Sequence, residues 1–151
     1  MTTTPSSTLG GATTPSDAAA LLRRHRLRCT PSRLHTLVVL SACGRHLCAA
    51  EVSAELHRHG APVAPSTVYR TLDALTEAGI AHAVRGPGAT RYAITSKPHH
   101  HAVCRQCGQV EALPVEHLRG AVERLTELTG WQPDASGAFS IYYCRCAHCA
   151  E

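Results

Sequence analysis

The sequence predicts an α+β protein, with an N-terminal winged helix-turn-helix domain followed by a small α/β domain. Two observations carry this prediction. Four stretches with helical spacing of apolar residues precede two short β-prone runs around a Gly-Pro-Gly turn at 86–88. Further strand-like runs and two Cys-x-x-Cys pairs follow. We expect a disordered tail over 1–15, a winged-helix domain over 16–95 and an α/β domain over 96–151.

Composition restricts the class of protein. Of the 151 residues, 44% are hydrophobic but only 4% are aromatic, so the core must be mainly aliphatic. No apolar run is long enough to span a bilayer, and the N-terminus lacks the basic-then-apolar pattern of a secretory signal. We therefore expect a cytoplasmic protein without a membrane partner. In a reducing cytosol, its eight cysteines favour metal or redox chemistry over disulfides.

Charge is unevenly distributed along the chain. The stretch from Asp17 to Arg91 holds ten arginines and five acidic residues, a net charge of +5. The stretch from Tyr92 to Glu151 has a net charge of −1. The first stretch is thus the candidate for binding a polyanion such as DNA. The alternative, an ordinary solvated surface rich in arginine, stays open on charge alone.

The N-terminal domain begins with three predicted helices. Residues 1–15 are mostly Thr, Ser, Pro and Gly, and should be disordered because they bury too little apolar surface. Ser16 and Asp17 predict the cap of a helix over 18–26. Thr30 and Pro31 then predict the start of a second helix that ends at Gly44. A third helix is expected from about Ala49 to His59.

The fourth predicted helix, from Ser66 to about Ala78, is the candidate recognition helix. Val68, Leu72 and Leu75 lie at i, i+4 and i+7 and predict one buried face. Tyr69 and Arg70 then face outward, where they suit contact with a thymine methyl and hydrogen bonds to guanine or phosphate. The following hairpin would be the wing. Alternatively, Tyr69 packs on a neighbouring helix and Arg70 is only solvated.

The second domain is predicted to contain strands and one long helix. The runs HAVC and QVEAL flank a turn at Cys104–Gly108, and a final strand is expected over Phe139–Tyr143. Between them, Pro114 to Thr129 has the spacing of an amphipathic helix. Its inward face should consist of Leu118, Val122, Leu125 and Leu128.

The two Cys-x-x-Cys pairs, Cys104 with Cys107 and Cys146 with Cys149, predict a structural zinc site. Two residues between thiolates let both sulfurs reach one ion at about 2.3 Å, and two pairs complete a tetrahedron. The site would join the first strands to the last and add on the order of 10 kcal/mol to folding. Cys144 is an alternative ligand, but Cys146 keeps the two-residue spacing. A thioredoxin-like redox pair is the other interpretation.

His99 and His101 are candidates for a second metal site. In a strand, residues i and i+2 face the same side, so both imidazoles could share one ion while His100 faces away. Imidazole ligands suit Zn, Fe, Ni or Cu. A run of exposed histidines without metal is the alternative.

The motifs STVYRTLDALTEAGI at Ser66–Ile80 and HHHAVCRQCG at His99–Gly108, with the final Cys-x-x-Cys, resemble the ferric uptake regulator family of bacterial metal-sensing repressors, with the zinc uptake regulators as a possible subgroup. LRCTPSRL at Leu27–Leu34 is also similar to that family. The resemblance spans about Asp17 to Cys149. It implies a homodimer with a C-terminal dimerisation domain, in which a regulatory metal adjusts both recognition helices to a palindromic AT-rich double-stranded DNA operator.

The resemblance also implies roles for particular residues. His82, in the first wing strand, and His46, before the third helix, correspond to positions that bind the regulatory metal in the family, together with His99 and His101. The residues at DNA-contacting positions are Arg28, Ser66, Thr67, Tyr69 and Arg70.

The expected cofactors are a structural Zn²⁺ and a second divalent metal. A histidine set without a carboxylate favours zinc as that second metal, with Fe²⁺ as the alternative. An iron- or peroxide-responsive regulator is the alternative function within the family. We expect neither enzymatic activity nor a small-molecule substrate. The alternative of another class is a zinc- or thiol-dependent enzyme, which needs an open metal position or a reactive thiol.

Overall fold

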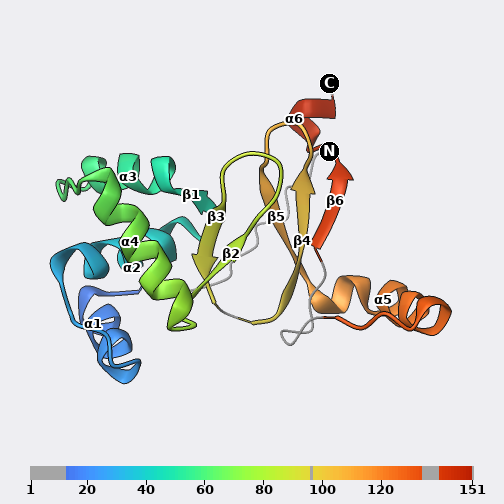
Figure 1. Ribbon diagram of the computed structural model, residues 1–151, viewed down its shortest axis with the longest axis horizontal. Coiled ribbons are helices and arrows are strands. Elements are labelled where there is room, and N and C mark those ends of the chain that lie inside the picture. The colour runs from blue at the N-terminus through green and yellow to red at the C-terminus, as the bar shows by residue number, and fades with distance from the viewer. Residues whose placement is uncertain (1–12, 96, 134–139, 151) are drawn as a thin grey trace, which may run out of the picture. The chain divides into compact units, whose positions relative to one another are not determined.

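The computed structural model describes residues 13–95, 97–133 and 140–150 (Figure 1). The predicted α+β class is confirmed. Within these ranges, every helix is too short or too polar to span a bilayer. The helices are α1 (Pro15–Arg24), α2 (Pro31–Cys43), α3 (Ala49–Arg58), α4 (Pro65–Glu77), α5 (Val115–Thr129) and α6 (Ala147–Ala150). The strands are β1 (Leu47–Cys48), β2 (Ala81–Val84), β3 (Arg91–Ile94), β4 (His99–Cys104), β5 (Val110–Pro114) and β6 (Ser140–Cys144).

The chain divides into two compact units. The first comprises the described residues of Met1–His82 and Tyr92–Ser96, and the second those of Ala83–Arg91 and Lys97–Glu151. The tip of the β2–β3 hairpin is therefore grouped with the second unit, whereas the predicted division at residues 95 and 96 left it in the first. The physical reason is a buried cluster in which Val84 packs with Val103 and Val110.

The start of α1 corrects two expectations. The predicted tail over 1–15 lies largely outside the described residues, but Pro15 is already helical and Thr13 contacts Ser41, with 2.6 Å between their hydroxyl oxygens. The cap is Thr14 and not Ser16. The Thr14 hydroxyl accepts from the Asp17 backbone N–H, and the Asp17 carboxylate accepts from the Thr14 N–H. This reciprocal pair leaves Asp17 at the third helical position.

The remaining helices of the first unit follow the predicted pattern. Thr30 caps α2, and Gly44 ends it in the left-handed conformation. The predicted inward residues of α4, Val68, Leu72 and Leu75, are all buried. The core of this unit combines α1, α2, the end of α4 and the start of β2, because their apolar faces meet in one buried cluster of Ala18, Leu22, Leu37, Leu75, Ile80 and Ala81.

The hairpin forms as predicted but has a third strand that sequence patterning did not reveal. β1, β3 and β2 form a sheet in that order. β1 has only two residues, too few to show an alternating pattern. It places the segment that contains His46 beside the hairpin that contains His82.

The second unit is built on a sheet in the order β5–β4–β6. β4 pairs antiparallel with β5, His99 opposite Pro114, and parallel with β6, Cys104 opposite Cys144. The final strand was predicted over Phe139–Tyr143; its first residue lies outside the described ranges. Pairing of β4 with β6 brings the chain segments that hold the two cysteine pairs to one end of the sheet.

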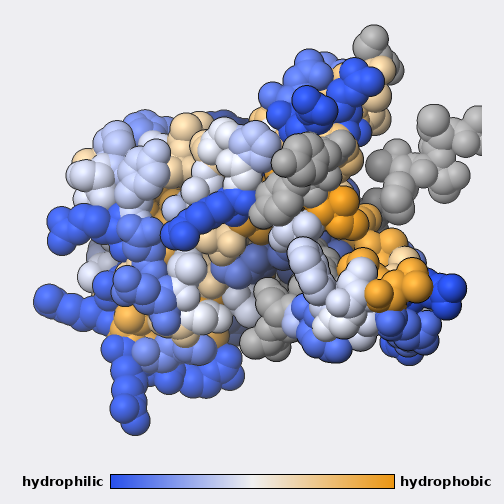
Figure 2. Space-filling view, turned by 45° about the vertical axis from the view of Figure 1, so that its right-hand side comes forward, coloured by the Kyte–Doolittle hydropathy of each residue, from blue (hydrophilic) through white to orange (hydrophobic). Residues whose placement is uncertain are grey.

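The predicted inward face of α5 is only partly covered in the single chain, because Leu118 and Val122 are half-buried whereas Leu125 and Leu128 are exposed. None of its residues is buried; Leu125 is 38% exposed and Leu128 69% exposed. Trp131, directly beyond the helix, is 71% exposed. Figure 2 shows hydrophobic surface in the region of this helix. Helical periodicity identifies an apolar face that favours burial, but it does not tell whether the same chain or a second chain buries it.

Candidate metal centres and nucleic-acid interface

Four cysteines of the second unit converge on one point. Cys104 ends β4, Cys107 lies in the turn before β5, Cys146 follows β6 and Cys149 lies in α6. The four sulfurs lie within 4.8 Å of one another, and Cys107 Sγ is 3.7 Å from Cys146 Sγ. Two sulfurs bound to one tetrahedral ion at about 2.3 Å lie about 3.8 Å apart. The cluster therefore has the dimensions of a four-thiolate metal site.

The groups around the cluster favour loss of the proton from Cys104 and oppose its loss from Cys149. Backbone N–H groups, chiefly that of Cys107 and then that of Cys146, lower the pKa of the Cys104 thiol to about 6. The Cys146 N–H lies 3.4 Å from Cys104 Sγ. Hydrogen bonding to Cys146, followed by burial, raises the pKa of Cys149 to about 12. A set of thiols with this spread needs a cation at its centre to lose all its protons at neutral pH.

Cys144, the alternative ligand, points elsewhere. Its thiol donates to the Val103 carbonyl, with 3.1 Å between sulfur and oxygen. The cluster of four sulfurs does not include it. The geometry therefore favours Cys146, as its two-residue spacing to Cys149 indicates.

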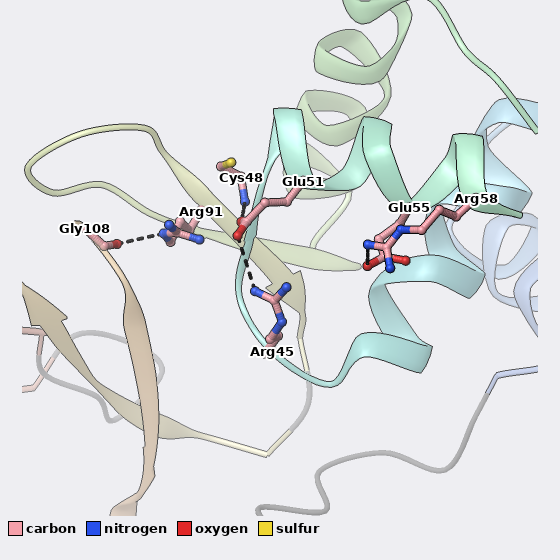
Figure 3. A network of polar contacts seen from close by, with 7 residues as sticks. All are labelled: Arg45, Cys48, Glu51, Glu55, Arg58, Arg91 and Gly108. Carbon is pink, nitrogen blue, oxygen red and sulfur yellow. Dashed lines mark hydrogen bonds and ion pairs between the residues drawn. The ribbon is translucent and has the colours of Figure 1, made fainter. Parts of the chain in front are cut away.

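In the first unit, His46 and His82 form a histidine pair. Their Nε2 atoms are 2.9 Å apart and their rings meet edge to face. His46 is buried, although it precedes a two-residue strand. Glu51 fixes the chain on both sides of it, because its carboxylate accepts from the Cys48 N–H at 2.8 Å and pairs with Arg45 at 3.5 Å (Figure 3).

In the second unit, His99 and His101 form another pair on β4. Their ring centroids are 4.7 Å apart, as expected for residues i and i+2 of a strand. His99 Nδ1 donates to the Lys97 carbonyl oxygen at 2.9 Å, so Nε2 is the ring nitrogen that would bind a metal. A backbone carbonyl that fixes the tautomer in this way is typical of metal-binding histidines. His100 is almost fully buried.

The predicted DNA-contacting residues lie on the surface of the first unit. Tyr69 is 54% exposed on α4, at the edge of the buried face formed by Val68, Leu72 and Leu75. Ser66 and Arg70 are also exposed on α4, and Thr67 is half-buried. Arg28 is exposed between α1 and α2, where the Arg33 guanidinium donates to its carbonyl at 2.9 Å.

Sequence reasoning missed two groups of residues that position these sites. One is Glu51; the only sequence signal for it is its place three residues after Cys48, at the start of a helix. The other is the contact between Arg91 and Gly108 (Figure 3). It joins segments distant in the sequence, and no motif predicts it.

A winged-helix fold with an exposed Tyr-Arg face, joined to a unit with a four-sulfur cluster, defines the class of metal-responsive transcriptional regulators. Residues 24–136 match the model of the ferric uptake regulator family, and the chain belongs to that family. It is 35% identical to the ferric uptake regulation protein of Bacillus subtilis over 65% of this chain and 69% of the relative. It is 27% identical to the peroxide-responsive repressor PerR of Staphylococcus aureus strain Mu50 over 74% of this chain and 75% of that protein.

The fold agrees with a solved structure of the same family. The ferric uptake regulator of Vibrio cholerae superposes with a TM-score of 0.68 at 25% identity, over 84% of this chain and 98% of that one. The protein is accordingly a metal-responsive transcriptional regulator of the ferric uptake regulator family.

Proposed function

We propose that the protein is a zinc-responsive repressor that binds a palindromic operator as a homodimer. The observation that carries this proposal is that the candidate metal ligands fall into a set of cysteines and a set of histidines, with no residue in common. Four thiols form one closed cluster, and the histidine pairs, one in each unit, contribute no ligand to it. A closed four-sulfur site is typical of structural zinc, and we propose that the histidines bind the regulatory metal instead.

The histidine pairs suit a regulatory role because each is incomplete. A tetrahedral ion takes four ligands, and each pair offers two. We propose that His46 and His82 from the first unit and His99 and His101 from the second bind one ion. Binding would then select one arrangement of the two units, which is the kind of differential affinity that a metal-dependent switch requires.

The sensed metal is proposed from the chemistry of the ligands. An all-imidazole set suits zinc, because harder ions favour oxygen ligands. Iron is the alternative, and the similarity to a peroxide-responsive repressor keeps an iron-dependent peroxide response as a second candidate function. The enzyme alternative has less support, because four thiolates leave no coordination position for a substrate.

The homodimer is supported by the exposed apolar face of α5, where Leu125, Leu128 and Trp131 lie uncovered in the single chain. DNA binding is supported by the exposed Tyr69 and Arg70 on α4, whose other face is buried. These surfaces lie on separate units, so one could bind a second subunit while the other binds DNA.

The proposal is tested with a DNA mobility shift. A duplex selected from a random pool in the presence of Zn²⁺ is titrated with protein under Zn²⁺, Fe²⁺, Mn²⁺ and Ni²⁺. We expect Zn²⁺ to promote binding at the lowest concentration. Equal affinity with and without every metal would overturn the metal-dependent mechanism, and a response to Fe²⁺ that peroxide abolishes would establish the alternative.

Two variants separate the metal sites. His99→Ala should abolish metal-dependent DNA binding while the protein remains a dimer with one zinc per chain. Cys104→Ser should lose that zinc and the dimer. Equal damage from both variants would mean that the chain has one metal site instead of two.

A further inference from the structure

The tip of the hairpin is fastened to the cysteine turn within the second unit. We call residues 83–91 the wing tip and residues 104–108 the knuckle. The Arg91 guanidinium donates through Nε to the Gly108 carbonyl, with 2.7 Å between nitrogen and oxygen (Figure 3). Val84 of the wing tip lies in a buried cluster with Val103 and Val110, on either side of the knuckle. A charge-assisted hydrogen bond and an apolar contact thus act on the same segment.

The backbones of the two segments also approach closely at Gly108. This residue has φ +71°, and a Cβ added to it would lie 2.5 Å from the Pro87 carbonyl oxygen. Any side chain at position 108 is therefore disfavoured for two reasons: the left-handed backbone conformation strains it, and its Cβ would clash with the wing tip. Gly108 also closes the knuckle, because its N–H donates to the Cys104 carbonyl at 2.9 Å.

The position of Gly108 is set by the cysteines. It directly follows Cys107, and its hydrogen bond to Cys104 spans the turn that holds both sulfurs. A metal ion bound by the cluster fixes this turn, because all four sulfurs must lie at one bonding distance from it. Anything fastened to Gly108 is then fixed as well.

We propose that the knuckle is a support for the wing, and that metal bound by the four cysteines holds the wing tip in place through Arg91, Gly108 and Pro87. These are positioning residues. The inference rests on the proposed structural zinc, but not on the histidine pairs or on the sensed metal. Two metal sites would then act on DNA binding by separate routes. The metal bound by the histidines would select the arrangement of the two units, and the metal bound by the cysteines would hold the wing tip in position.

The test is hydrogen exchange of the full-length protein, measured by mass spectrometry on peptides covering 84–91. Arg91→Ala removes the hydrogen bond. Arg105→Ala is the matched control, because it deletes the same charge from an exposed position of the knuckle itself. We expect wing-tip amides to exchange about tenfold faster or more in Arg91→Ala, because a hydrogen bond from a charged donor changes an opening equilibrium by that factor. Arg105→Ala should match the parent.

A second pair of variants tests the close approach. Gly108→Ala should speed wing-tip exchange, because the new Cβ must displace Pro87. Gly130→Ala has the same backbone φ of +71° but no atom within 4 Å of the added Cβ, so it should leave the wing unchanged. Removal of zinc by Cys107→Ser should speed wing-tip exchange at least as much as Arg91→Ala does.

Zinc content, measured on the same samples, separates the possible failures. A parent protein that binds no zinc at the cysteines overturns the structural site and this inference together. A zinc-loaded Arg91→Ala protein whose wing tip exchanges at the parent rate overturns the inference alone. If Gly108→Ala itself loses zinc, Arg91→Ala still decides the outcome.

Discussion

The Nε2 atoms of His46 and His82 lie 2.9 Å apart although 36 positions separate the two residues in the chain. At this distance the Nε2–H of one imidazole donates a hydrogen bond to Nε2 of the other. Two nitrogens bound to one tetrahedral zinc at about 2.0–2.1 Å lie about 3.3 Å apart. An ion could therefore replace the shared proton if the rings opened by a few tenths of an ångström, so the first unit holds half of the proposed site already formed.

The histidine pair gives the first prediction. His46→Ala and His82→Ala should each lower the affinity for the second metal by about 100-fold or more. Even the loss of a group that only orients a ligand lowers metal affinity by about 10–100-fold. Competition against a metal-binding dye measures the affinity after the cysteine site is filled. His35→Ala, which changes an exposed histidine of α2, is the control. Unaltered affinity in His82→Ala would remove that residue from the site.

The second prediction concerns the surplus cysteine beside the cluster. Cys107→Ser should lose one zinc per chain and much of the thermal stability, since a structural zinc contributes on the order of 10 kcal/mol. Cys144→Ser should keep the zinc, because this thiol bonds the Val103 carbonyl and lies outside the four-sulfur set. Metal analysis and thermal melts measure both effects. Zinc loss in Cys144→Ser would show that Cys144, and not Cys146, is the zinc ligand.

The third prediction concerns α4. Arg70→Ala should weaken DNA binding and, if the side chain neutralises one phosphate, reduce the slope of log affinity against log salt by about 1. Fluorescence anisotropy at several salt concentrations measures this slope. Arg119→Ala, which removes an exposed arginine from α5, should leave the slope unchanged. An equally large change of slope in Arg119→Ala would show that the net charge of the protein, and not contact through α4, determines DNA affinity.

The fourth prediction concerns α5. Leu128→Glu should convert the proposed dimer to monomer, because it places a charge on the exposed apolar face that a second subunit would cover. Analytical ultracentrifugation gives the oligomeric state. Arg119→Glu changes charge on the same helix at an exposed position and should remain a dimer. A Leu128→Glu dimer as tight as the parent would place the interface elsewhere.

The fifth prediction concerns the start of α1. The Thr14 hydroxyl and then its backbone N–H lower the pKa of Asp17 below 3.8. Because the native pKa is the lower one, this stabilisation is present above the unfolded pKa and is lost as pH falls through the native pKa. At pH 7, Thr14→Ala should cost about 1 kcal/mol.

The matching test is a double-mutant cycle of Thr14→Ala and Asp17→Asn, followed by urea unfolding at pH 7 and pH 3. The coupling between the two residues should be favourable at pH 7 and diminish at pH 3. Other acid-sensitive groups are common to all four proteins and cancel in the cycle. A coupling that stays constant with pH would show that the capping box does not depend on the Asp17 charge.

Local spacing determined much of this protein. The buried face of α4, the left-handed ends of α2 and α5, and the two cysteine pairs all depend on residues within a few positions of one another. The sequence alone therefore predicted the fold class and the thiol set. It missed the cap at Thr14, because Ser16 and Asp17 are also good capping residues and only the hydrogen bonds show which one serves.

Tertiary structure decided which distant segments meet. The two-residue β1 brings His46 to His82, the wing tip lies against Gly108, and α5 leaves Leu128 exposed. Periodicity and motifs record what each segment requires, such as a buried face or a metal ion. They do not record which segment meets that requirement, because pairing over long separations depends on chain reversal and on the packing of the whole unit.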